Sequence, residues 1–72
     1  MMRFQGHTSA YMENGEKNFT VHCSLRKRED GKRMWLGYIV NNDTGTMFAM
    51  LGDQFNSIEE IYAKAKIEIE KG

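Results

Sequence analysis

The feature that most constrains the fold is a strict alternation of apolar and polar residues over positions 19–27. The apolar members are Phe19, Val21, Cys23 and Leu25. A period of two is typical of a strand that buries one face. The pair Asp30-Gly31 follows and favours a two-residue turn of type I′. We therefore expect a hairpin whose return strand covers residues 33–41.

The turn also predicts which side chains share a face. If Asp30 and Gly31 are the whole loop, Leu25 lies opposite Leu36 on an apolar face. The other face then pairs Arg26 with Trp35. This arrangement predicts an apolar face that needs a cover and an open face that carries an arginine beside the only tryptophan of the chain.

Residues 57–71 change to the period of a helix. The apolar stripe consists of Ile58, Ile61, Tyr62, Ala65 and Ile69. Ser57 and Glu60 have the spacing of a capping box, which marks a helix start. We expect this amphipathic helix to cover the apolar face of the hairpin.

The remaining segments complete the predicted architecture. Residues 41–45 contain a second turn with Gly45 available for a left-handed conformation, and an apolar run over 46–51 predicts a further strand. Residues 1–18 predict either a weaker extra strand or a flexible arm. The prediction is one α+β domain over 1–72: an antiparallel sheet of three or four strands, with 19–51 as its main part, packed on one face by the carboxy-terminal helix.

Composition restricts the function classes. The 72 residues include ten acidic and ten basic side chains, so a general electrostatic attraction to nucleic acid or to a membrane is absent. A single cysteine cannot form an internal disulfide, and no secretory leader pattern is present. No apolar run approaches the roughly 20 residues of a membrane span. We expect a cytoplasmic protein without membrane contact.

No residue pattern predicts catalysis, a cofactor or a metal. The only histidines and cysteine are His7, His22 and Cys23. His22 and Cys23 are adjacent on a strand, so they point to opposite faces and cannot chelate one ion together. A structural zinc site needs four protein ligands. We expect Cys23 to be a buried thiol, no resident metal or cofactor, and a protein that is not an enzyme.

Several short motifs together carry a resemblance to a known family. They are S-L-R-K-R-E-D-G-K at 24–32, Trp35, Y-I-V at 38–40, the turn at 41–45, and G-D-Q-F-N-S-I-E-E at 52–60. In this order they resemble the arm-type, AP2-like DNA-binding domain at the amino terminus of tyrosine recombinases of phages and mobile elements. The resemblance covers about residues 24–60. It implies a sheet backed by a carboxy-terminal helix, with the open sheet face entering the major groove.

The resemblance also implies roles for particular residues. By position, the DNA-facing sheet would carry Arg26, Arg28, Arg33 and Trp35. Lys27 and Lys32 would reach phosphates. The leading expectation is therefore a small non-enzymatic module that binds double-stranded DNA through these six residues.

A second expectation remains open beside DNA binding. The strand at 46–51 is apolar where the family usually carries basic residues, and Glu29 and Asp30 lower the potential at the hairpin. These features favour a protein contact. The alternative is a small phage-type protein-binding or inhibitor protein that uses the same face or a sheet edge, with a homodimer as one form of it.

Overall fold

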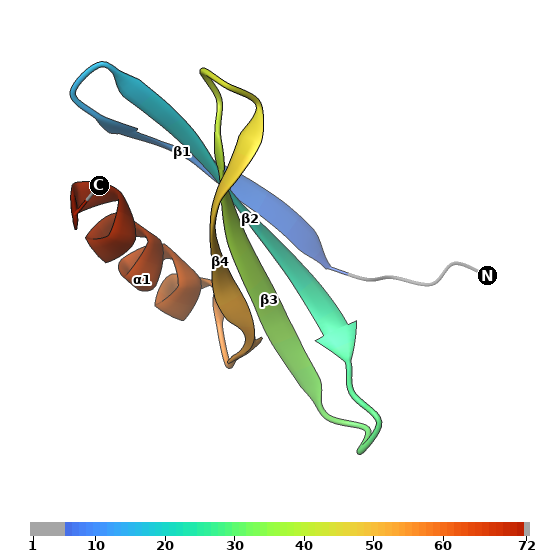
Figure 1. Ribbon diagram of the computed structural model, residues 1–72. Helices are drawn as coiled ribbons and strands as arrows, with labels where there is room; N and C mark the ends of the chain where they lie inside the picture. Colours follow the sequence, from blue (N-terminus) through green and yellow to red (C-terminus); the bar gives the residue numbers. More distant parts are fainter. Residues whose placement is uncertain (1–5, 72) are drawn as a thin grey trace.

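A four-stranded antiparallel sheet and one helix make up the computed structural model, which describes residues 6–71 (Figure 1). In chain order the elements are β1 (His7–Asn14), β2 (Lys17–Lys27), β3 (Arg33–Asn41), β4 (Thr46–Phe55) and α1 (Ile58–Lys71). The strands lie in the order β1-β2-β3-β4, so each neighbour in sequence is a neighbour in the sheet. This confirms the predicted α+β fold, with four strands.

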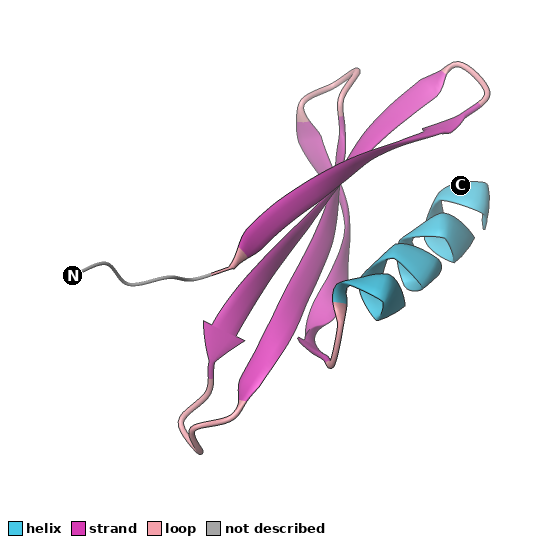
Figure 2. Cartoon of the chain, turned by 180° about the vertical axis from the view of Figure 1, so that it is seen from behind, coloured by secondary structure: helices cyan, strands magenta, loops and turns pink. Residues whose placement is uncertain are grey.

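The helix α1 packs against one face of the sheet and leaves the other face uncovered (Figure 2). The buried core consists of Phe19, Val21, Cys23, Ile39, Ile61, Ala65 and Ile69. The helix start has the predicted cap: the backbone N–H of Glu60 donates to Ser57 Oγ at 3.3 Å, and that of Asn56 donates to Glu60 Oε1 at 3.0 Å. The uncovered side is called the open face below.

The β2–β3 hairpin corrects the predicted register by one residue. Its loop has three residues, Glu29, Asp30 and Gly31, because the Arg28 N–H donates to the Lys32 carbonyl at 2.8 Å. The Gly31 N–H donates to the Arg28 carbonyl at 3.0 Å, and Gly31 has a φ of 86°. A type I turn followed by a left-handed glycine is a common three-residue hairpin loop.

The extra loop residue changes every pair in this hairpin. Leu25 lies opposite Trp35, and Ser24 lies opposite Leu36. The prediction that Leu25 faces Leu36 and that Arg26 faces Trp35 is wrong. A shift of one residue moves a whole strand from one face to the other, so Trp35 lies on the helix side, where it packs against the core.

Gly37 shows why this register suits the helix. The residue is buried opposite Cys23, and a Cβ atom built on it would lie 2.5 Å from Ile61 Cγ2. Such a distance is shorter than any real carbon contact, so only glycine lets α1 approach β3 this closely. The predicted register would have left Gly37 on the open face, where it has no such purpose.

An extra strand was one of the two predictions for residues 1–18. The strand β1, His7–Asn14, is that strand, and it forms a hairpin with β2. Its loop is Gly15-Glu16, with Asn14 opposite Lys17. Gly15 has a φ of 66°, which suits the first position of a type II′ turn. Residues 1–5 of the predicted arm lie outside the described residues.

The last hairpin begins with the predicted turn. Asn41 Oδ1 accepts from the backbone N–H of Asp43 at 2.8 Å, and Gly45 has a φ of 75°. The strand β4 is longer than predicted and irregular, with three register shifts against β3. At one of them lies Phe48, which stays 36% exposed although its ring centroid is 4.9 Å from that of Phe19.

Candidate protein interface on the open sheet face

The basic hairpin tip, residues 26–33, does not present its predicted site residues on one face. Strand alternation places Arg26, Arg28 and Lys32 on the open face, because Arg26 pairs with Met34 and Arg28 with Lys32. Lys27 pairs with Arg33 on the helix side. Trp35 follows them there, half-buried beside Leu25.

The predicted DNA-facing set is therefore divided. Arg33 and Trp35, expected beside Arg26 and Arg28, lie on the other face of the ribbon, and Lys32 takes the open-face position instead. The cause is again the third loop residue. The strand assignments were right, and the pairing between them was not.

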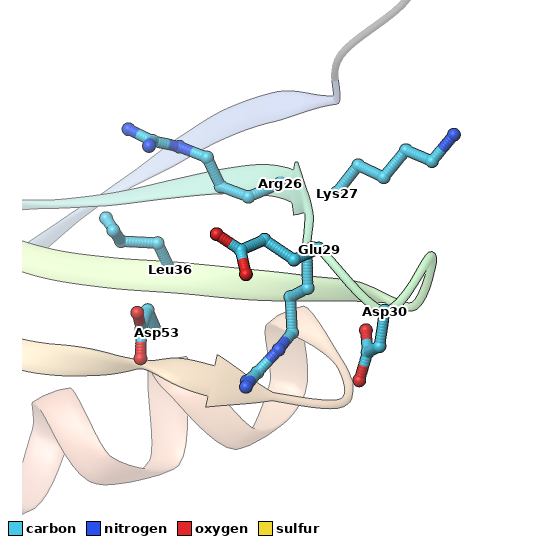
Figure 3. Close-up of a pocket in the computed structure, with 7 residues that line it drawn as sticks. Arg26, Lys27, Glu29, Asp30, Leu36 and Asp53 are labelled. Carbon is cyan, nitrogen blue, oxygen red and sulfur yellow. The ribbon is translucent and has the colours of Figure 1, made fainter.

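Charges at the tip are mixed. A hollow of about 510 Å³ lies here (Figure 3), lined by Arg26, Lys27, Arg28, Glu29, Asp30, Leu36 and Asp53. Three bases and three acids thus surround it, so the hollow itself is not a strong anion site. The tip as a whole has five bases and two acids, a net charge of +3, and the rest of the neutral chain therefore carries −3. Within residues 6–71, none of the five tip bases forms an ion pair.

The centre of the open face is different from the tip because it carries no full charge. Two rows of paired residues cross the four strands there. One row is Tyr11, Thr20, Val40 and Met47, and the next is Ser9, His22, Tyr38 and Met50. Side chains directly opposite in an antiparallel sheet share a face and touch. The five large apolar members, Tyr11, Tyr38, Val40, Met47 and Met50, are called the apolar patch below.

Three of the five members of the apolar patch are highly exposed, and Tyr38 and Val40 are partly buried. Tyr11 is 58% exposed, Met50 57% and Met47 55%. Monomeric proteins seldom leave large apolar side chains side by side in water without a function for them. Tyrosine and methionine are also enriched in protein interfaces, where methionine adapts to irregular surfaces.

Aromatic rings stiffen one end of the patch. The His22 ring stacks on Tyr38, with centroids 5.0 Å apart and planes inclined by 19°, and lies 5.9 Å from the His7 ring. Stacking leaves His22 Nδ1 buried and without a hydrogen-bond partner among the described residues. A buried nitrogen that lacks a partner costs free energy.

Cys23 lies on the opposite side of the sheet and has no part in this surface. It is fully buried, as predicted. Burial raises the pKa of the thiol, and a hydrogen bond with Tyr62 opposes part of that rise. A buried thiol of raised pKa is a poor nucleophile.

Metal ligands do not gather anywhere in residues 6–71: no group of three or more His, Cys, Asp or Glu side chains is close enough to hold an ion. The described part of the chain also contains no helix with the length and apolarity that crossing a membrane requires.

The apolar patch was not predicted from the sequence, because the predicted register placed Tyr38 and Val40 under the helix. Gly37 was the available clue, since a glycine in mid-strand indicates a close approach by another element. No family model, curated protein or solved structure matches the chain.

Proposed function

We propose that the protein is a small non-enzymatic binding module that holds another protein against its open face. The observation that carries this proposal is the pair of charge-free rows across the sheet, with Tyr11, Met47 and Met50 each more than half exposed. Burying such side chains contributes about 25 cal/mol per Å² of apolar area removed from water.

The hairpin tip defines the partner further. Arg26, Arg28 and Lys32 lie on the same face as the apolar patch, at one end of it, and are exposed. A matching partner carries an apolar surface beside a group of carboxylates. Charge at the rim of an interface mainly raises the association rate and selects the partner, whereas the buried apolar centre supplies most of the affinity.

Site-specific photo-crosslinking in the host cell tests the proposal. Met50 and Ile67 are exposed to almost the same extent, 57% and 55%, but lie on the open face and on the helix surface respectively. A photoreactive amino acid at position 50 should cross-link to a discrete protein, and the same amino acid at position 67 should not. Equal cross-linking at both positions, or none at position 50, would contradict the proposal.

A second pair of variants separates specific binding from general stickiness. With the cross-linker at position 47, Met50→Lys should abolish the product because it places a charge in the apolar centre. Arg26→Glu should reduce the yield of the same product by opposing the partner's carboxylates. A product that is insensitive to both substitutions would indicate non-specific contact.

Binding of double-stranded DNA is a second candidate, supported by the net charge of +3 at the tip. A two-stranded ribbon fits the major groove, and Arg26, Arg28 and Lys32 are exposed on one side of this ribbon. If these three bases neutralise three phosphates, the slope of log affinity against log salt should be about −3. Fluorescence titration of labelled duplexes measures this slope, and absence of binding at low salt would exclude the DNA function.

A further inference from the structure

The two edges of the sheet differ in their readiness to pair with another strand. The outer strand β4 has three register shifts, which interrupt any continuous ladder along its edge. The outer strand β1 pairs with β2 without a shift over all eight residues, His7–Asn14. Its sequence HTSAYMEN contains no lysine, arginine or proline. Charged side chains, proline and bulges are the usual protection of an exposed edge, and β1 has only Glu13, next to its last residue.

Backbone hydrogen bonds show which groups of β1 face outward. The Leu25 N–H donates to the Gly6 carbonyl at 2.8 Å. Even-numbered residues of β1 therefore bond to β2, because the bonding direction alternates along a strand. The N–H and C=O groups of His7, Ser9, Tyr11 and Glu13 point to the free edge, where the described sheet has no further strand.

We propose that β1 pairs with β1 of a second copy, antiparallel, around a two-fold axis at Ala10. This register is the one that pairs all four outward-facing residues within the strand. Ser9 lies opposite Tyr11 of the second copy, and His7 lies opposite Glu13 of the second copy. Moving the axis to Tyr11 would place His7 opposite the loop at Gly15, and moving it to Ser9 would leave Glu13 without an opposite residue in His7–Asn14.

Side chains in this register are complementary on both faces. On the open face an imidazole N–H of His7 can donate to the carboxylate of Glu13, once on each side of the axis. On the helix side the small Ala10 side chains meet at the axis, and Met12 meets Thr8. A hollow of about 250 Å³ beside that last pair is lined by Met12, Glu13, Lys66, Ile69 and Glu70.

The proposed dimer does not depend on the proposed protein-binding function. It would, however, double the area of the open face, to which that function is assigned. A two-fold axis perpendicular to the sheet joins the two sheets into one of eight strands. Both open faces then lie on the same side, and the two basic tips lie at opposite ends. The partner strand is a second copy of this chain, so no other ligand is needed to test the pairing.

Sedimentation equilibrium with Ser9 variants tests the pairing. The wild-type chain should sediment with twice the 8.4 kDa mass of one chain. Ser9→Pro removes an outward N–H that β2 does not use, and proline is tolerated at such an edge position. The substitution is present in both copies, so the dimer loses two hydrogen bonds. The dissociation constant should therefore rise about thirtyfold. Ser9→Ala keeps the N–H and should dimerise as the wild type does, and circular dichroism checks that both variants fold.

Exchange of the facing pair tests the register. His7→Glu opposes two carboxylates and should weaken the dimer by about tenfold. The double variant His7→Glu/Glu13→Lys places a carboxylate opposite an ammonium group on each side of the axis and should restore the affinity. A wild-type chain that stays monomeric up to about 1 mM, the weak end of specific association, would overturn the proposal. A dimer that Ser9→Pro leaves equally tight would also overturn it, by showing that another surface is used.

Discussion

The two hairpins that share β2 carry nearly the same turn signal, and they close differently. In the first, Asn14 ends β1 and the loop is Gly15-Glu16. In the second, Asp30-Gly31 is preceded in the loop by Glu29, which makes three residues. The pair Asn-Gly or Asp-Gly therefore indicates that a hairpin is present, but it does not determine how many residues the loop contains.

The effect of a wrong loop assignment depends on whether it shifts the strand pairing by an even or an odd number of residues. Taking Asn14-Gly15 as the first loop shifts that pairing by two residues, and every side chain keeps its face. Taking Asp30-Gly31 as the second loop shifts that pairing by one, and β3 turns over completely. A difference of one loop residue thus separates the register in which Trp35 meets the helix from the register in which Leu36 does.

The largest expected effect contrasts those two neighbours. Trp35→Ala should lower the free energy of unfolding by about 3 kcal/mol, because the ring packs against the core on the helix side. Leu36→Ala on the open face should cost about 1 kcal/mol. Urea denaturation of both variants measures the difference. A larger loss of stability for Leu36→Ala than for Trp35→Ala would support the two-residue loop and the predicted register instead.

A second substitution tests the close approach at Gly37. Gly37→Ala should destabilise the protein by about 2 kcal/mol, because its Cβ would overlap Ile61 Cγ2 in a packed core. Ser24→Ala, on the open face of the neighbouring strand, is the matched control and should be close to neutral. A harmless Gly37→Ala would mean that residue 37 faces water.

The two turn glycines both have a positive φ but belong to turns of different type. Gly15 and Gly31 both have positive φ, 66° and 86°, and a Cβ on either meets no atom within 4 Å. Gly31 follows a type I turn in the left-handed region, so Gly31→Ala should cost about 1 kcal/mol. The first position of a type II′ turn is nearly restricted to glycine, so Gly15→Ala should cost about 2 kcal/mol. Thermal melts should show the larger shift for Gly15→Ala, and equal shifts for the two variants would mean that Gly15 does not lie in a type II′ turn.

The smallest effect is expected from deletion of Glu29. The shortened loop Asp30-Gly31 can form a type I′ turn between Arg28 and Lys32, which already face each other. Stability should change by less than about 1 kcal/mol. Cross-strand nuclear Overhauser effects between Leu25 and Trp35 should persist. Their replacement by Leu25–Leu36 effects would show that the loop does not set the register.

Local sequence patterns were sufficient to predict the strands and the helix and their order along the chain. The alternation over 19–27 and the stripe from Ile58 to Ile69 identified β2 and α1 within two residues, because each depends on neighbours in sequence. Cys23 was placed in the core correctly, since the buried face of β2 did not depend on the pairing.

Prediction of the candidate interface depended on the pairing between neighbouring strands. Local sequence patterns do not fix that pairing to better than one residue. Tyr38 and Val40 reach the open face only in the observed register, and the irregular β4 adds Met47 and Met50 beside them. The choice between registers is made by the fit of Ile61 over Gly37. That contact joins residues far apart in the chain, so no window of sequence contains it.

The tip carries a net charge of +3 and the remaining chain carries −3, so charge is unevenly distributed along this neutral molecule. Its isoelectric point of about 6.7 lies near neutral pH, where neighbouring molecules no longer repel one another. At low ionic strength the basic tip of one molecule attracts the acidic remainder of the next. Salt at physiological concentration, with a Debye length of about 8 Å, screens that attraction. The protein should therefore salt in: concentrated solutions that turn cloudy in dilute buffer should clear when sodium chloride is added.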